Sequence, residues 1–83
     1  MEKVLINLYV PSIGESFDVY IPVFLTVKEI ILLLAKAIEN LSDGRYLSSG
    51  QEILCLKNRN MILTETHLLE DYAVRTGEKF VFI

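Results

Sequence analysis

The residues that could carry chemistry are few and widely separated in this chain. His67 is the only histidine and Cys55 the only cysteine among 83 residues. A metal site or a general acid–base pair needs several such groups close together, and neither residue has a second histidine or cysteine to join it. We interpret His67 as a solvated loop histidine. No catalytic residue, metal site or cofactor is expected.

Cys55 and the carboxylates near the C-terminal end favour structural roles. Cys55 lies within an apolar run, without a basic neighbour that would lower the pKa of its thiol. Ferredoxin-type sites need four cluster-ligating cysteines, so that class is excluded. Glu65, Glu70 and Asp71 are expected to be solvated turn residues, with Asp71 accepting backbone hydrogen bonds. The four glycines are isolated and form no phosphate-binding loop. We therefore predict that the protein is not an enzyme.

Length and composition predict one small domain, residues 1–83, held together by apolar burial. Hydrophobic residues form 52% of the chain, and the mean hydropathy is +0.40. A single cysteine permits no internal disulfide. The net charge is −3 and the basic residues are scattered, so nucleic-acid binding is not expected. Because the chain shows no secretory leader and no apolar run of about 20 residues, we expect a cytoplasmic protein without direct membrane insertion.

Hydrophobic alternation predicts two strands at the start of the chain. Residues 4–10 alternate between apolar and mixed faces, and residues 11–15 form a turn. Residues 16–21 return as the second strand, with Phe17, Val19 and Ile21 on one face. The first two strands are thus expected to form a hairpin.

A helix is expected next, because Thr26 and Glu29 match a capping box. An apolar stripe then recurs at helical spacing, and residues 42–44 supply the stop. The positions expected to be buried are Val27, Ile30, Ile31, Leu34, Ala35, Ile38 and Leu41.

The remaining residues predict a loop and three more strands. Residues 45–51 form the loop, which Tyr46 and Leu47 could attach to the core. The strands are expected at residues 53–57, 61–63 and 79–83. This element order predicts an α+β fold of the β-grasp type, in which a mixed sheet of four to five strands packs on one central helix. The first and last strands are expected to pair in parallel at the centre.

The last twenty residues resemble the closing segment of ubiquitin-like β-grasp domains. They contain Leu-Leu-Glu-Asp-Tyr at 68–72, a Thr-Gly-Glu turn at 76–78, and Lys-Phe-Val-Phe-Ile at 79–83. Ubiquitin continues past this strand into a tail ending in Gly-Gly, whose carboxylate is conjugated. The sequence here stops at Ile83, so the resemblance implies the ubiquitin fold without conjugation.

Within that superfamily the chain resembles the YukD/EsaB family, small ubiquitin-like proteins of the Gram-positive type VII secretion machinery. The matching residues are Leu-Lys-Asn at 56–58, Arg-Asn at 59–60, Leu-Glu-Asp at 69–71, Val74, and Thr-Gly-Glu-Lys-Phe at 76–80. Tyr72 also occurs in ubiquitin and does not separate the two families, and the N-terminal half matches only in pattern. The resemblance implies a bacterial accessory protein whose partner is the cytoplasmic region of a membrane secretion component.

The sheet face turned away from the helix is expected to carry an unusual number of apolar residues, whereas such a face is normally polar. The third strand is apolar on both faces, and by analogy with ubiquitin we favour Ile53 and Cys55 outward, with Leu54 and Leu56 as the open alternative. In ubiquitin this face forms the patch that partners recognise. A small domain exposes some apolar area in any case, but a cluster of this size favours an interface. The predicted protein-binding residues are Leu5, Tyr9, Tyr20, Ile53, Cys55, Val81 and Ile83.

A second candidate protein-binding site lies on the helix. Leu32 and Leu33 fall outside the buried stripe and could provide a contact. Alternatively, Leu33 flanks the core and Leu32 is merely exposed.

We interpret the protein as a non-conjugated ubiquitin-like adaptor or regulatory subunit. Apolar outer-face residues would anchor the partner, and polar residues such as Asp18 and Arg75 would set its orientation. One alternative is a self-associating structural protein, a homodimer that buries the patch against its own copy. A second alternative, a modifier or sulfur carrier, requires the Gly-Gly end that this sequence lacks.

Overall fold

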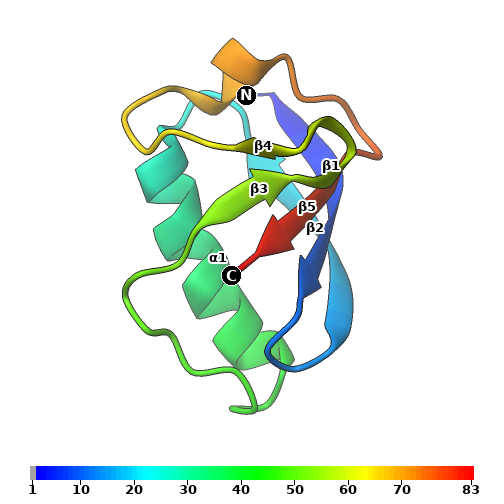
Figure 1. Cartoon of the computed structure of the whole chain (residues 1–83), viewed down its shortest axis with the longest axis vertical. Helices are drawn as coiled ribbons and strands as arrows, with labels where there is room; N and C mark the ends of the chain where they lie inside the picture. Colours follow the sequence, from blue (N-terminus) through cyan, green and yellow to red (C-terminus); the bar gives the residue numbers. More distant parts are fainter. Residues whose placement is uncertain (1) are drawn as a thin grey trace.

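A five-stranded sheet and one long helix make up the fold of the computed structural model, which describes residues 2–83 (Figure 1). The strands are β1 (Lys3–Val10), β2 (Glu15–Pro22), β3 (Leu54–Leu56), β4 (Met61–Ile62) and β5 (Lys79–Phe82). The helix α1 spans Val27–Leu41, and two short 3-10 helices, η1 (Lys57–Arg59) and η2 (Leu69–Tyr72), lie in the connections. No helix within the described residues is both long and apolar enough to cross a lipid bilayer.

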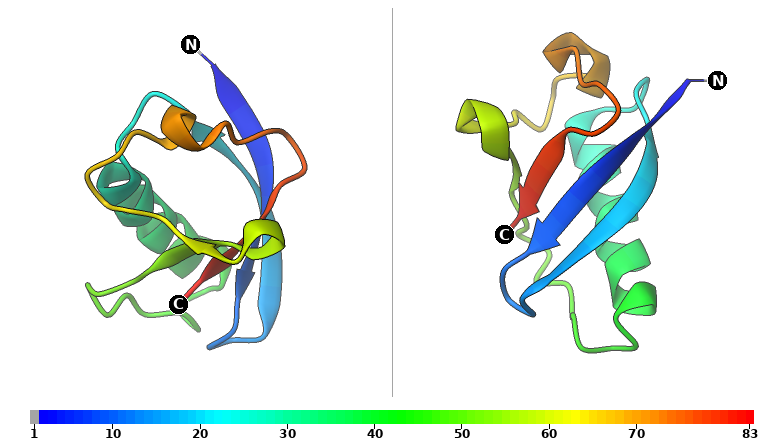
Figure 2. Two further views of the ribbon diagram at one scale, coloured as in Figure 1. Left: turned by 45° about the horizontal axis from the view of Figure 1, so that its top comes forward. Right: turned by 90° about the vertical axis from the view of Figure 1, so that its right-hand side faces the viewer.

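The strands follow the order β2-β1-β5-β3-β4. Strands β1 and β2 form an antiparallel hairpin, and β3 is antiparallel to both β4 and β5. Strand β5 lies parallel to β1 at the centre of the sheet. Figure 2 shows α1 crossing one face of this sheet, and within residues 2–83 no second α-helix covers the opposite face. The predicted α+β architecture is confirmed.

The capping box predicted from the sequence starts α1. The Thr26 hydroxyl accepts a hydrogen bond from the Glu29 amide at 3.2 Å, and the Glu29 carboxylate accepts one from the Thr26 amide at 3.0 Å. The bond from the Thr26 amide, together with that from its hydroxyl, lowers the pKa of Glu29. The helix ends at Leu41 with Ser42 as its C-cap, and Gly44, with a φ of +82°, donates its amide to the Glu39 carbonyl at 3.0 Å. The local residues therefore set both ends of the helix.

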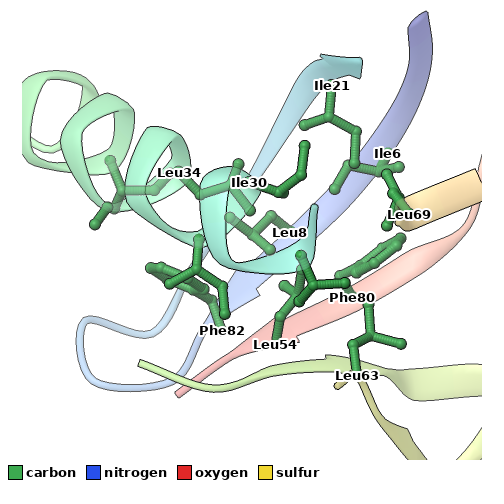
Figure 3. Close-up of a cluster of buried hydrophobic side chains, with 14 of the residues drawn as sticks. Ile6, Leu8, Ile21, Ile30, Leu34, Leu54, Leu63, Leu69, Phe80 and Phe82 are labelled. Atoms are coloured by element: carbon green, nitrogen blue, oxygen red, sulfur yellow. The ribbon is translucent and has the colours of Figure 1, made fainter. Parts of the chain in front are cut away.

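The core fills the space between α1 and the inner face of the sheet. Figure 3 shows side chains from the helix packed against those of β1, β3 and β5, and Phe80 and Phe82 are the side chains that β5 contributes. The side chains that are almost completely buried include Ile6, Leu8, Val10, Val27, Ile30, Ile38, Leu54, Leu56, Leu69, Phe80 and Phe82. Six of the seven helix positions predicted to be buried are buried.

Two predictions about the end of the helix and the following loop are wrong. Leu41 and Leu47 are exposed, at 56% and 77% of their surface. Ser42 is buried next to Leu41, and Tyr46, which was also predicted to attach the loop to the core, is buried as predicted. The Ser42 hydroxyl accepts the Tyr46 amide at 3.0 Å, and the Tyr46 ring lies 5.9 Å from that of Phe82. Tyr46 therefore closes this end of the core, and neither leucine is needed there.

The inward orientation of Leu54 can be tested by comparison with its neighbour Ile53. Leu54 is fully buried, whereas Ile53 lies on the other face of the sheet and is exposed. We expect Leu54→Ala to lower the free energy of unfolding by about 2–5 kcal/mol, because the substitution leaves a cavity. Ile53→Ala, the matched control, is expected to cost less than about 1 kcal/mol. Urea denaturation would measure both, and a larger loss for Ile53→Ala would contradict this strand register.

Candidate protein-binding surface

Outward apolar side chains form a continuous row across four strands. Tyr9 of β1 lies opposite Val81 of β5, Val81 lies opposite Cys55 of β3, and Cys55 lies opposite Ile62 of β4. Ile53 and Ile83 extend the same face, since each donates its amide to the carbonyl of the other, at 2.7 and 2.9 Å. We call these residues the outer-face patch: Tyr9, Ile53, Cys55, Ile62, Val81 and Ile83.

The outer-face patch is open to solvent and partly concave. Ile62 and Ile83 are 66% and 64% exposed. Side chains from β3, β4 and β5 line a depression of about 330 Å³, with Lys57 on its border. Leu54 and Leu56 point inward and are fully buried. The structure therefore has the favoured third-strand register, with Ile53 and Cys55 outward.

Two residues of the predicted site, Leu5 and Tyr20, lie apart from the others. They are opposite each other on β1 and β2. Between this pair and Tyr9 runs a polar row in which Asp18, Asn7 and Lys79 lie side by side. The Asn7 amide group donates to the Asp18 carboxylate at 3.1 Å. The predicted seven-residue surface is thus divided into the outer-face patch and a separate Leu5–Tyr20 pair.

Ile62 belongs to the patch, although the sequence analysis did not include it. It is directly opposite Cys55 in the β3–β4 hairpin. The sequence did contain a signal for this placement, because the short connection between the two strands predicts a hairpin. Residues opposite each other in a hairpin share a face of the sheet. Once Cys55 is placed outward, Ile62 follows.

The residues first considered for chemistry have structural surroundings. Burial raises the pKa of the Cys55 thiol, which leaves it a neutral and weakly polar side chain within the patch. His67 is exposed in a loop, as predicted, and its ring nitrogen lies 3.2 Å from the Tyr72 hydroxyl. Asp71 accepts the Leu68 amide at 3.0 Å, as predicted. Within residues 2–83, no group of three metal-binding side chains occurs.

The second predicted site, on α1, is exposed. Both Leu32 and Leu33 lie on the solvent side of the helix. The alternative in which Leu33 flanks the core is therefore wrong. Whether either residue binds a partner stays a prediction.

A buried carboxylate orders the loop that leads into the patch. Glu52 is only 9% exposed, and one of its oxygens, Oε2, accepts three hydrogen bonds. The donors are the Tyr46 hydroxyl at 2.6 Å, the Ser48 hydroxyl at 2.6 Å and the Ser49 amide at 3.0 Å. These bonds hold the loop next to Ile53, and so they fix one end of the outer-face patch.

The ionisation states of this cluster follow from its contacts. Burial opposes ionisation of Glu52, but the hydrogen bonds from Ser48, Tyr46, its own backbone amide and the Ser49 amide together outweigh it and lower the pKa of the carboxyl. Burial, followed by the bond to Glu52, raises the pKa of the Tyr46 phenol far above its ordinary value. At neutral pH a charged carboxylate therefore accepts from a protonated phenol, which is a strong type of hydrogen bond.

The hairpin turn on the opposite side of the depression is held by Arg59. Its guanidinium donates to the Tyr72 carbonyl at 2.6 Å, to the Ala73 carbonyl at 3.3 Å and to the Glu78 carboxylate at 2.6 Å. These contacts join the β3–β4 turn to the segment that enters β5. The strands that carry the patch are thereby fixed relative to one another.

Comparison with solved structures identifies the fold. The ubiquitin-like domain of Plasmodium falciparum Dsk2 matches with a TM-score of 0.71 at 18% identity, covering 99% of this chain and 100% of that domain. An Arabidopsis thaliana ubiquitin-like domain gives 0.73 at 16% identity, covering 100% of this chain and 78% of the other. Caldiarchaeum subterraneum ubiquitin gives 0.69 at 20% identity, covering 99% and 92%.

The chain has the ubiquitin-like β-grasp fold. No protein-family profile and no curated protein sequence matches it. At these low identities, the likeness between this chain and the three solved structures shows only that they share a fold. Its function must be argued from its own surface.

The Tyr46–Glu52 bond can be tested by removing only the donor. We expect Tyr46→Phe to lower the free energy of unfolding by about 1–3 kcal/mol, because the buried carboxylate loses a charged hydrogen bond. Amide hydrogen exchange in residues 48–52 should also become faster. Tyr20→Phe removes an exposed hydroxyl and serves as the control, with an expected change below about 0.5 kcal/mol. Equal effects for the two variants would contradict the role of this bond.

The lowered pKa of Glu52 predicts how stability varies with pH. A carboxyl whose pKa is lower when folded stabilises the protein above its ordinary value of 4.5, and that contribution is lost as pH falls through the folded pKa. We expect the urea midpoint to drop as pH falls below 4.5, and the drop to be smaller in Glu52→Gln. The pKa of Glu29 is also lowered in the folded protein, so part of the loss of stability in acid should persist in Glu52→Gln. A midpoint that rises in acid would contradict this account.

Proposed function

We propose that this ubiquitin-like domain is an adaptor that binds another protein through the outer-face patch. The observation that carries the proposal is the apolar row from Tyr9 through Val81 and Cys55 to Ile62 on the sheet face turned away from α1. Contiguous apolar surface of this kind is typical of interfaces. The concave part between β3, β4 and β5 gives a side chain of the partner a place to anchor.

Charge on the same face favours a partner with an acidic border. The outward positions of the sheet include Lys3, Lys79 and one acidic residue, Asp18. Lys57 of η1 borders the depression on the same face, so the net charge is +2 from three positive and one negative side chain. The whole chain has a net charge of −3. The outer face is therefore positive on an otherwise acidic protein. Complementary charge would speed and orient association with an apolar surface bordered by Asp or Glu.

The type VII secretion role rests on the resemblance to the YukD/EsaB family. In this proposal the protein acts in the bacterial cytoplasm without being conjugated, and its partner is the cytoplasmic part of a membrane secretion component. The support is the match between residues 56 and 80 described above. Docking, rather than catalysis, would be its mode of action.

The proposal can be tested with a charge placed on the most exposed patch residue. Ile62→Glu should lower affinity for the partner at least about tenfold, since it introduces a charge where apolar contact is expected. Leu47→Glu is the matched control, because Leu47 is also an exposed apolar residue and lies in the loop before β3. The readout is recovery of secretion components from a Gram-positive cell envelope by wild type and both variants, with the fold checked by circular dichroism.

The outcomes of this experiment are distinct. Secretion components retained by wild type and Leu47→Glu but lost by folded Ile62→Glu would support the proposal. Equal recovery by all three proteins would place the interface elsewhere. A mass that rises with concentration in sedimentation, and falls to that of a monomer in Ile62→Glu, would instead favour the self-associating alternative.

A further inference from the structure

A second depression lies between the beginning of α1 and the segment that precedes β3. Its volume is about 310 Å³, and its apolar lining comes from Ile31, Leu32 and Ile53. Lys28 and Glu65 also line it, and residues 50–52 close one side. The Lys28 amide donates to the Glu65 carbonyl at 3.1 Å, which holds that segment against the first turn of the helix. The depression is therefore built from three segments that are distant in sequence.

Glu52 is the buried charged residue that lines this depression. The three hydrogen bonds that Glu52 accepts all converge on Oε2, and Oε1 accepts none from another residue. In the part of the chain that the structure describes, every fully buried side-chain nitrogen or oxygen has a partner. The Glu52 carboxyl also accepts a hydrogen bond from its own backbone amide, and the residue is 9% exposed. Because Glu52 lines this depression, its negative charge contributes to the wall that a ligand would meet.

The charges around the depression favour a single positive group. Glu52 and Glu65 contribute two negative charges and Lys28 one positive charge, a net charge of −1. The ion pairs found in residues 2–83 are Arg45–Glu15 and Arg59–Glu78, so neither Lys28 nor Glu65 is paired there. A hard divalent metal ion fits poorly, since it prefers six or more oxygen ligands and the walls are apolar. An organic cation with an apolar stem fits both the walls and the charge.

We infer that this depression binds an arginine or lysine side chain of a partner protein. The methylene stem would pack against Leu32 and Ile53, and the charged head would meet the carboxylates of Glu52 and Glu65. The inference does not depend on the outer-face patch, although Ile53 borders both surfaces. In this inference the exposed Leu32 has a specific role, because it forms part of the apolar wall against which the methylene stem of the ligand packs.

The inference can be tested by NMR titration of the isotope-labelled protein with butylguanidinium, an analogue of the arginine side chain. We expect saturable shifts of the amides of residues 28–32 and 50–53, in the millimolar range or weaker, which is about the affinity of a small fragment. The uncharged 1-pentanol should give much smaller shifts at these amides. A capped Leu-Arg-Leu tripeptide should bind more tightly than butylguanidinium, because its apolar residues add contacts with Leu32.

Two exposed positions provide variants with opposite expected effects. Glu65→Gln should weaken binding roughly two- to fivefold, and Lys28→Gln should strengthen it by a similar factor, the size expected for an exposed charge pair. Neither side chain forms an ion pair in the fold, so both variants should fold, and unfolding midpoints would verify this. No saturable shift at residues 50–53, or the same affinity in both variants, would overturn the inference. If butylguanidinium bound at least as tightly as the tripeptide, the conclusion that the ligand is a side chain of a partner protein would be overturned.

Discussion

The position of β5 between β1 and β3 is the constraint on which the rest of the structure depends. Its alternating side chains divide between two environments, with Phe80 and Phe82 buried under α1 and Val81 and Ile83 on the outer face. The parallel pairing with β1 and the antiparallel pairing with β3 join the two halves of the chain. A shift of one residue would exchange the two faces and destroy both core and patch. The burial of two phenylalanines therefore also fixes the outward position of Val81.

The elements with a strong local pattern could be predicted from the sequence. Strict alternation defined the first hairpin, and the Thr26–Glu29 pair defined the start of α1, because in both cases neighbouring residues determine the geometry. The third strand was harder, since Ile53, Leu54, Cys55 and Leu56 are apolar on both faces. Its orientation followed from the pairing with β5, which periodicity alone does not reveal.

Where the sequence analysis failed, contacts between distant residues had decided the structure. Tyr46 reaches Phe82 and Glu52, so Leu41 and Leu47 are left in solvent. The polar row that separates Tyr20 from the patch depends on the β1–β5 register. The depression at Glu52 is built from a helix, a loop and Glu65, and none of these shows a sequence pattern that points to the others.

The two candidate surfaces carry opposite charge and meet at Ile53. The outer face has a net charge of +2 from Lys3, Lys57, Lys79 and Asp18, whereas the depression at Glu52 has a net charge of −1. A partner that covered both would need an acidic border on one side of an apolar centre and an arginine or lysine on the other. Such a pattern would fix its orientation more firmly than apolar contact alone.

The central claim, that a partner covers the outer-face patch, can be tested on the unaltered protein through Cys55. This is the only cysteine, it is half-buried, and it lies in the middle of the patch. The measurement is the rate of thiol alkylation in buffer and in the complex isolated from native cell envelope. We predict that the complex slows the reaction at least about tenfold, since the partner would exclude the reagent from the depression. An unchanged rate in a complex that contains the protein would contradict the account.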